Sequence, residues 1–98
     1  MIWFSSEAAE DLRSIRAWYQ QPEPALADQF LTAVRLTARI ILRHPLAFRE
    51  VEAGIRQASL PRFPYLLYYQ PQDDGIVVLR VLHMRRRPMA RRKMGEMA

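Results

Sequence analysis

Basic side chains are the residues of this sequence best suited to a chemical task, and they gather in its second half. Fourteen of the fifteen basic residues are arginine, and the formal net charge is +5. Residues 1–50 carry six basic and six acidic side chains, whereas residues 51–98 carry nine basic and four acidic ones. A guanidinium group is planar and can bind phosphate or carboxylate through two parallel hydrogen bonds. We therefore expect the second half to bind a polyanion or an acidic protein surface.

The C-terminal segment, residues 85–98, holds the densest charge, with six basic side chains and one acidic side chain. Like charges packed this closely repel one another, so the run favours contact with an anionic partner. Arg80 joins the set because it interrupts an otherwise apolar run just before the segment. We predict that the target is bound by Arg80 together with the basic side chains of the C-terminal segment: Arg85, Arg86, Arg87, Arg91, Arg92 and Lys93.

The same cluster raises the question of RNA cleavage. Cleavage through the 2′-hydroxyl of RNA needs a base, an acid and positive charge on the phosphate. His83 is the one side chain near the cluster whose usual pKa lies close to neutral, and a lone histidine at a strand end is more often a packed residue. A base is therefore scarce in this cluster. If the protein is a nuclease, the residues that we expect to act are Arg56, Arg62, His83, Arg85 and Arg86.

The composition argues against several other kinds of site. The chain has no cysteine, hence no disulfide, no thiol nucleophile and no cysteine-based zinc site. Its two histidines lie far apart, and the adjacent carboxylates Asp73 and Asp74 fit a turn, so we expect no metal, no cofactor and no small-molecule substrate. No apolar run approaches the roughly 20 residues that span a bilayer, and no basic region precedes residues 1–4. The sequence predicts a cytoplasmic protein without membrane association.

A β-hairpin is the element around which the chain is organised. Two apolar runs, residues 65–70 and 76–84, are rich in residue types that favour strands. Between them lies the turn sequence of residues 71–75, in which Asp74 and Gly75 are expected to supply the positive φ angles of a tight turn. Alternate side chains of a strand share a face, and we predict one such set in the second run: Val77, Leu79, Val81 and His83.

Two amphipathic helices are expected before the hairpin. Ser5 and Ser6 offer hydroxyl groups that can cap a first helix, which ends before Pro22. Pro24 suits the first position of a second helix that should run to about Arg43. Apolar side chains recur at helical spacing in both segments, so each helix has one face to bury. The short connection predicts an antiparallel helical hairpin packed on the sheet.

The remaining segments complete an α+β fold. Residues 1–4 are expected to form a short strand, residues 45–54 a loop, and residues 55–60 another strand. The order is then strand, helix, helix, strand, strand, strand (β-α-α-β-β-β): a small antiparallel β-sheet packed against an N-terminal helical hairpin. We expect a single domain over residues 1–98, including the basic tail of residues 85–98. Near the start of the first helix, Glu10 and Asp11 are expected to face solvent.

Four short motifs follow one another along the chain and carry a family resemblance. They read AAEDL at residues 8–12, LRHP at 42–45, RFPY at 62–65 and VLRVLH at 78–83, with Arg87-Pro88 after the last. In order and spacing they resemble the RelE/ParE toxins of bacterial type II toxin–antitoxin pairs. The resemblance covers almost the whole chain and implies the fold of that family, an antiparallel sheet backed by a helical hairpin.

The resemblance is closer to the ParE branch, mainly through residues 63–65 and 81–83 with Arg87-Pro88. It implies a toxin without a catalytic residue that inhibits DNA gyrase and hence replication and is neutralised by a cognate, ParD-like antitoxin. It also implies that the toxin meets DNA through the toxin–antitoxin complex. An acidic, amphipathic antitoxin segment could cover an apolar groove between the helices. The side chains that we expect in that groove are apolar and come from both helices: Leu12, Ile15, Trp18, Tyr19, Phe30 and Val34.

Two alternatives stay open at this point. The first is a RelE-like, ribosome-dependent mRNA endonuclease, although Pro64-Tyr65 stands where such nucleases commonly carry an arginine and no tyrosine follows Pro88. The second is a nucleic-acid-binding module without toxicity, which predicts tight, salt-sensitive binding of DNA or RNA and no growth arrest. Substitution of His83 separates the first alternative from gyrase inhibition, because acid–base chemistry depends on that side chain.

Overall fold

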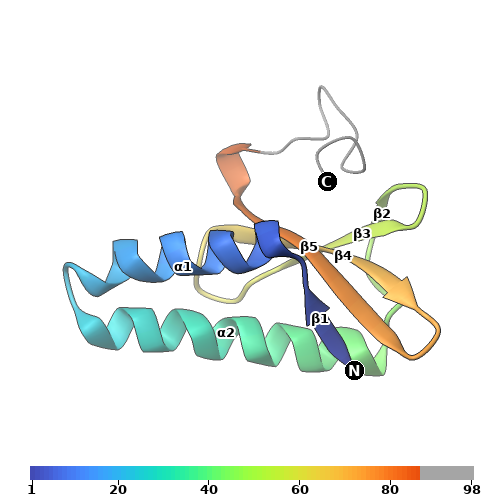
Figure 1. The fold of residues 1–98 in the computed structure, drawn as a ribbon, viewed down its shortest axis with the longest axis horizontal. Helices are drawn as coiled ribbons and strands as arrows, with labels where there is room; N and C mark the ends of the chain where they lie inside the picture. Colours follow the sequence, from blue (N-terminus) through green and yellow to red (C-terminus); the bar gives the residue numbers. More distant parts are fainter. Residues whose placement is uncertain (87–98) are drawn as a thin grey trace.

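Two antiparallel helices pack on one face of a five-stranded sheet (Figure 1). The computed structural model describes residues 1–86. A 3₁₀ turn, Met84–Arg86, follows the last strand. The spatial order of the strands is β1-β5-β4-β3-β2. In chain order the elements are β1 (Ile2–Phe4), α1 (Ser6–Gln20), α2 (Pro24–Arg43), β2 (Glu50–Glu52), β3 (Ile55–Ser59), β4 (Tyr65–Gln72) and β5 (Gly75–His83).

Local sequence signals set the bounds of both helices, as predicted. The side chain of Ser5 caps α1, since its hydroxyl oxygen accepts a hydrogen bond of 3.0 Å from the Ala8 amide. Pro24 opens α2, where its missing amide hydrogen and fixed φ are tolerated. At the other end of α2, His44 leaves the helical conformation directly before Pro45. No helix within residues 1–86 is long and apolar enough to cross a membrane.

The main core lies between the helices and the sheet. Phe30 and Ile41 of α2 are fully buried there against Leu67 and Tyr69 of β4. At one end of the core, four aromatic rings pack edge-on or offset at centroid distances of 5.1 to 6.5 Å: Tyr19, Phe30, Phe63 and Tyr65. Such ring pairs stabilise a fold by about 0.5–1.5 kcal/mol each beyond the effect of their buried area, so they help to hold the helical hairpin on the sheet.

The predicted hairpin of β4 and β5 is present, but its turn works differently from the prediction. Gly75 has a positive φ angle, at 159°, but Asp74 does not. Gly75 is also needed for a close approach, because a Cβ atom there would lie 1.8 Å from the carbonyl oxygen of Met1. That oxygen accepts a 2.9 Å hydrogen bond from the Ile76 amide, which joins β1 to β5. The glycine therefore allows the N-terminal strand to dock.

A β-bulge in β5 overturns the predicted division of its side chains between two faces. Tyr68 pairs with Arg80 but Tyr69 pairs with Val78, so Leu79 is an extra residue without a partner in β4. Beyond the bulge the alternation shifts by one position. Val81 therefore joins Ile76 and Val78 in the core under the helices, whereas Leu79 and Leu82 lie on the opposite face.

The sheet has one strand more than expected and is not entirely antiparallel. Residues 45–54, predicted to be a loop, contain β2, which pairs antiparallel with β3. Two of the three residues of β2 are glutamates, a type depleted in strands, so its sequence carries no strand signal. The expected N-terminal strand, β1, pairs parallel with β5 rather than antiparallel. The sheet is otherwise antiparallel, and the α+β architecture is confirmed.

Candidate functional site

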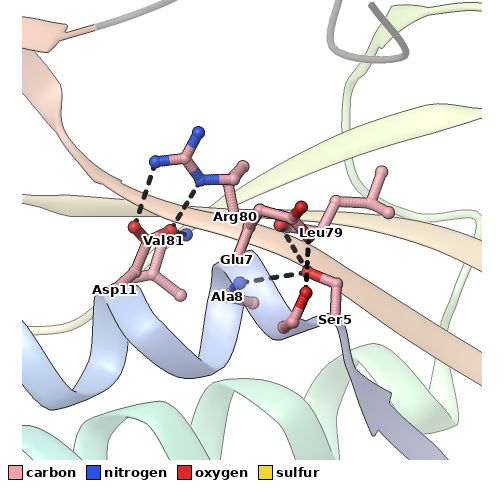
Figure 2. A network of polar contacts seen from close by, with 8 residues as sticks. Ser5, Glu7, Ala8, Asp11, Leu79, Arg80 and Val81 are labelled. Atoms are coloured by element: carbon pink, nitrogen blue, oxygen red, sulfur yellow. Dashed lines mark hydrogen bonds and ion pairs between the residues drawn. The ribbon is translucent and has the colours of Figure 1, made fainter. Parts of the chain in front are cut away.

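The start of α1 is fastened to the bulge of β5 by a network of polar contacts, which we call the bulge clasp and define as Ser5, Asp11 and Arg80 (Figure 2). The carboxylate of Asp11 accepts hydrogen bonds from two nitrogen atoms of Arg80, at 2.8 and 3.0 Å, and one of 2.9 Å from the Val81 amide. The Ser5 hydroxyl, besides capping α1, donates to the Leu79 carbonyl at 2.9 Å. These contacts satisfy backbone groups near the bulge, where the regular pairing with β4 is interrupted.

The bulge clasp is much less exposed to solvent than an ordinary surface ion pair. The side chains of Arg80 and Asp11 are 21% and 15% exposed, whereas those of the pair Arg13 and Glu10 are 68% and 65% exposed. The hydrogen bond with Asp11 raises the pKa of Arg80 above its ordinary value, so the guanidinium stays charged. Two of the three nitrogen atoms of Arg80 are thus committed to a structural contact, although the sequence suggested that this residue binds a target.

A groove of about 540 Å³ opens beside the bulge clasp, between α1 and the C-terminal end of β5. We call it the α1–β5 groove. Its walls combine an exposed indole, that of Trp18, with the exposed guanidinium groups of Arg85 and Arg86. The residues that line it come from α1, from β4 and β5 and from the 3₁₀ turn: Asp11, Ser14, Ile15, Trp18, Tyr65, Arg80, Val81, Leu82, His83, Arg85 and Arg86.

His83 lies in this groove but is poorly placed to act as a base. Its Nδ1 atom accepts a hydrogen bond of 3.1 Å from the Arg85 amide. A neutral imidazole has one accepting nitrogen, so that contact occupies the lone pair a base would use. The ring packs edge-on against Tyr65 at a centroid distance of 5.2 Å. These contacts tie His83 to the 3₁₀ turn and to the first residue of β4.

Tyr65 supplies a hydroxyl donor to the groove rather than a base. Burial, together with the neighbouring Tyr19 hydroxyl, raises the pKa of Tyr65 above its ordinary value, although Arg86 works in the other direction. The phenol therefore remains protonated near neutral pH. With protonated tyrosine, charged arginine and an engaged histidine, the α1–β5 groove is suited to binding an anionic or aromatic partner. Among residues 1–86, no three histidine, aspartate or glutamate side chains gather closely enough to hold a metal ion.

The residues predicted for a nuclease surface are not all brought together. His83, Arg85 and Arg86 share the α1–β5 groove. Arg56, on β3, donates hydrogen bonds of 3.1 and 2.7 Å to the carbonyl groups of Leu46 and Phe48 and so holds the preceding loop. Arg62 lies in the β3–β4 connection and lines a different groove. The predicted target-binding residues Arg87, Arg91, Arg92 and Lys93 lie outside the described residues.

Most side chains predicted to contact an antitoxin belong to the core. Phe30 is 0% exposed, Val34 3% and Ile15 8%, so they have almost no surface to offer a partner while the helices rest on the sheet. Leu12 and Tyr19 are partly buried against the same core. Only Trp18 is prominently available, at 68% exposure. The apolar stripes of the two helices are thus used mainly to hold the sheet.

Asp11 is the residue of this site that the sequence did not reveal. It was expected to face solvent, because an acidic side chain in the first turns of a helix needs no partner other than the helix dipole. The structure instead joins it to residues 69 and 70 positions away. One signal was available: a lone Arg80 within an apolar strand implies a buried or half-buried acidic partner.

Comparison with known proteins agrees with the fold and the order of its elements. No curated protein matches this chain. A solved structure titled "Chromosomal ParDE TA system from P. aeruginosa" has a chain with the same fold, at a TM-score of 0.71 and 21% identity, covering 84% of this chain and 92% of its own length. The family model for the ParE toxin of the type II toxin–antitoxin system parDE matches residues 2–88. The chain therefore belongs to the ParE family of toxins of type II toxin–antitoxin systems.

Proposed function

We propose that this protein inhibits DNA gyrase, and so blocks DNA replication, until a cognate antitoxin neutralises it. The membership in the ParE toxin family carries this proposal. The α1–β5 groove supports it, since it offers positive charge and an exposed indole for binding but no free base for chemistry. Gyrase acts on DNA inside the cell, so the proposal places the protein in the cytoplasm. A toxin–antitoxin complex would bring it to DNA as well.

The proposed gyrase-binding surface is the rim of the α1–β5 groove. Arg85 and Arg86 are exposed there and line the same groove as the indole of Trp18. Arginine and tryptophan are the side chains most often found at the energetic centres of protein interfaces. Arg87, Arg91, Arg92 and Lys93 would extend the positive charge beyond the groove. Arg80 would act mainly as a positioning residue, because the bulge clasp holds the strand that carries the rim.

A supercoiling assay with purified gyrase tests this surface. Arg85→Glu/Arg86→Glu should weaken inhibition at least about 30-fold, since a rim that attracts an acidic surface or DNA would repel it. Arg13→Glu/Arg16→Glu, on the exposed side of α1, is the matched control and should stay within about 3-fold of the wild type. Unchanged inhibition by the first variant would remove the rim from the mechanism.

The effect on cells separates the proposed target from the alternatives. After induction of the protein alone in a bacterial host, incorporation of labelled thymidine should fall before that of labelled methionine. The opposite order would point to the ribosome and to mRNA. If neither falls and growth continues, the toxin activity itself is refuted, and a nucleic-acid-binding module without toxicity becomes the better description.

Cleavage of mRNA is a second candidate, because Tyr65, His83, Arg85 and Arg86 do line one groove. His83→Gln distinguishes it from gyrase inhibition. A positioned acid or base contributes about 10²–10⁴-fold to a rate, so a nuclease should lose at least 100-fold of its activity in this variant. A gyrase inhibitor should lose little, because glutamine can still accept a hydrogen bond from the Arg85 amide. Retained toxicity with His83→Gln would therefore exclude histidine-dependent RNA cleavage.

A further inference from the structure

The outward side of α2 is a surface of the helical hairpin that lies outside the α1–β5 groove. Its inward side is buried in the core through residues such as Val34 and Ile41. On the outward side, two large apolar side chains reach solvent: Leu36 is 47% exposed and Ile40 is 52% exposed. We define the α2 outer face as these two residues together with three exposed arginines: Arg35, Arg39 and Arg43.

Helical geometry arranges this face in two parallel lines. Residues four apart lie one above the other on a helix, so Leu36 and Ile40 form an apolar line. The three arginines, at positions 35, 39 and 43, form an adjacent basic line. Within residues 1–86, none of these three guanidinium groups forms an ion pair, since the pairs found there involve Arg13 and Arg80. Three repelling charges beside exposed aliphatic side chains favour a partner that supplies carboxylates.

A second groove continues the apolar line. It has a volume of about 450 Å³ and lies between α2 and the connection from β3 to β4. Leu36 belongs to both surfaces, and Ala33 and Phe63 contribute further apolar area. Arg62 stands on the opposite wall in the left-handed backbone conformation, with φ at 70°, which is rare for a residue with a side chain. The basic line and Arg62 thus lie on opposite sides of the apolar surface, and Asp28 is the one acidic side chain among the residues that line this groove.

We propose that the α2 outer face and this second groove bind an acidic amphipathic helix of the cognate antitoxin. The proposal rests on the antitoxin named under the proposed function and adds where it docks. The apolar stripe of such a helix would cover Leu36 and Ile40, and carboxylates spaced four residues apart would meet the basic line. This surface differs from the antitoxin groove that the sequence predicted between the helices, whose central residues, such as Phe30, are buried.

Charge argues against the other occupants. A second copy of this chain would bring two sets of three unpaired arginines together, which is unfavourable at close range. A nucleic acid would satisfy the arginines but would leave Leu36 and Ile40 against a charged, hydrated backbone. An acidic amphipathic helix satisfies both lines at once.

The test is calorimetric titration of the full-length protein with its purified cognate antitoxin. Leu36→Ser/Ile40→Ser and Arg39→Glu/Arg43→Glu should each weaken binding at least about 30-fold, since each removes or reverses two central contacts. Leu46→Ser, at a loop residue that is 67% exposed, and Arg13→Glu/Arg16→Glu on α1 are the matched controls and should stay within about 3-fold. Circular dichroism checks that every variant is folded.

The outcomes distinguish this inference from the function on which it rests. If the wild type does not bind the antitoxin at all, the antitoxin part of the proposed function fails together with the inference. If the wild type binds and both double variants bind equally well, the inference alone is overturned. Two further results would overturn it: self-association of the wild type that Leu36→Ser/Ile40→Ser abolishes without weakening antitoxin binding, or DNA binding that only the arginine substitutions abolish.

Discussion

At the scale of single residues, one carboxylate does most to define the site. Asp11 accepts three hydrogen bonds, two from Arg80 and one from the Val81 amide. It thereby joins the first helix to the last strand at the point where pairing between β4 and β5 shifts register. Its neighbour Glu10 makes a more exposed contact with Arg13, three residues along the same helix. Asp11 and Glu10 are both carboxylates paired with an arginine, but Asp11 is 15% exposed and Glu10 is 65% exposed.

Asp11→Asn should therefore destabilise the fold far more than Glu10→Gln. The substitution replaces one of the two acceptor oxygens by a donor and leaves the partly buried Arg80 without an opposite charge, which we expect to lower the free energy of unfolding by about 1–3 kcal/mol. Glu10→Gln should change it by less than about 0.5 kcal/mol, because exposed ion pairs contribute little. Urea denaturation followed by circular dichroism measures both variants. Equal effects would show that the bulge clasp adds no stability.

His83 illustrates why the candidate site could be predicted only in part from its residues. Its position at the end of β5, next to the arginines, follows from the strand pattern. The hydrogen bond that occupies its Nδ1 atom comes from the Arg85 amide and depends on the backbone of the 3₁₀ turn. Side-chain type and spacing do not encode such a backbone contact, so the sequence could propose the histidine but not its hydrogen-bonded state.

At the scale of elements, β5 determines where the other parts lie. It contacts α1 on one face and pairs with β1 along one edge and β4 along the other. The backbone approach at Gly75 allows the pairing with β1, and the bulge aims Arg80 toward Asp11. The bulge clasp then holds the strand whose end leads to Arg85 and Arg86. An error in any of these features should displace the α1–β5 groove.

Gly75→Ala should detach the N-terminal strand. A Cβ atom 1.8 Å from the Met1 oxygen forces β1 to move, and we expect a loss of about 1–3 kcal/mol together with fast hydrogen exchange at the Ile76 amide. Gly54→Ala is the control, since its Cβ would meet only the side-chain Nε2 atom of Gln70, at 3.5 Å. The positive φ of 80° still makes that variant less stable by about 1–2 kcal/mol. Slow exchange at Ile76 in both variants would contradict this account.

The elements themselves were predicted where local sequence determines them. Both helices have clear periodicity, Ser5 and Pro24 mark their starts, and the hairpin follows from two apolar runs around a turn. The sequence could not predict β2, because Glu50 and Glu52 belong to a poor strand-forming type. It could not predict the bulge either, since a period of two carries no sign of one extra residue. These features depend on pairing between segments rather than on propensity.

At the scale of the whole molecule, positive charge is distributed over separate surfaces with different proposed partners. The rim of the α1–β5 groove carries Arg85 and Arg86, and the α2 outer face carries its own basic line. Because the two proposed surfaces are distinct, the antitoxin could bind the α2 outer face whether or not gyrase is bound at the groove rim. The variants proposed for the two surfaces should accordingly affect gyrase inhibition and antitoxin binding independently.

Alkaline pH should destabilise the whole fold through two core tyrosines. Burial raises the pKa of Tyr65 and of Tyr69 above their ordinary value near 10. Each therefore keeps its proton in the folded protein at a pH where the unfolded chain has lost it. This contribution to stability is complete below about pH 10 and is lost as the pH rises through the folded-state pKa.

The measurement is the urea midpoint at a series of pH values from 9 to about 11. The wild type should show a falling midpoint above about pH 10, and Tyr65→Phe/Tyr69→Phe should show a shallower fall. Tyr69 also donates a hydrogen bond of 2.7 Å to the Pro45 carbonyl, so the double variant should start from a lower midpoint at neutral pH. An identical slope in both proteins would mean that neither tyrosine is responsible.

The pairing of the first strand with the last also sets the order in which the protein can be built. The Ser5 hydroxyl reaches a carbonyl 74 residues away, so most of the chain must close before that contact forms, which makes folding slow. The helical hairpin needs only neighbouring sequence and is synthesised first. During translation, the α2 outer face is therefore synthesised before Arg85 and Arg86 of the α1–β5 groove. On every newly made copy, the residues of the proposed antitoxin site, up to Phe63, leave the ribosome before the two arginines of the proposed gyrase-binding rim.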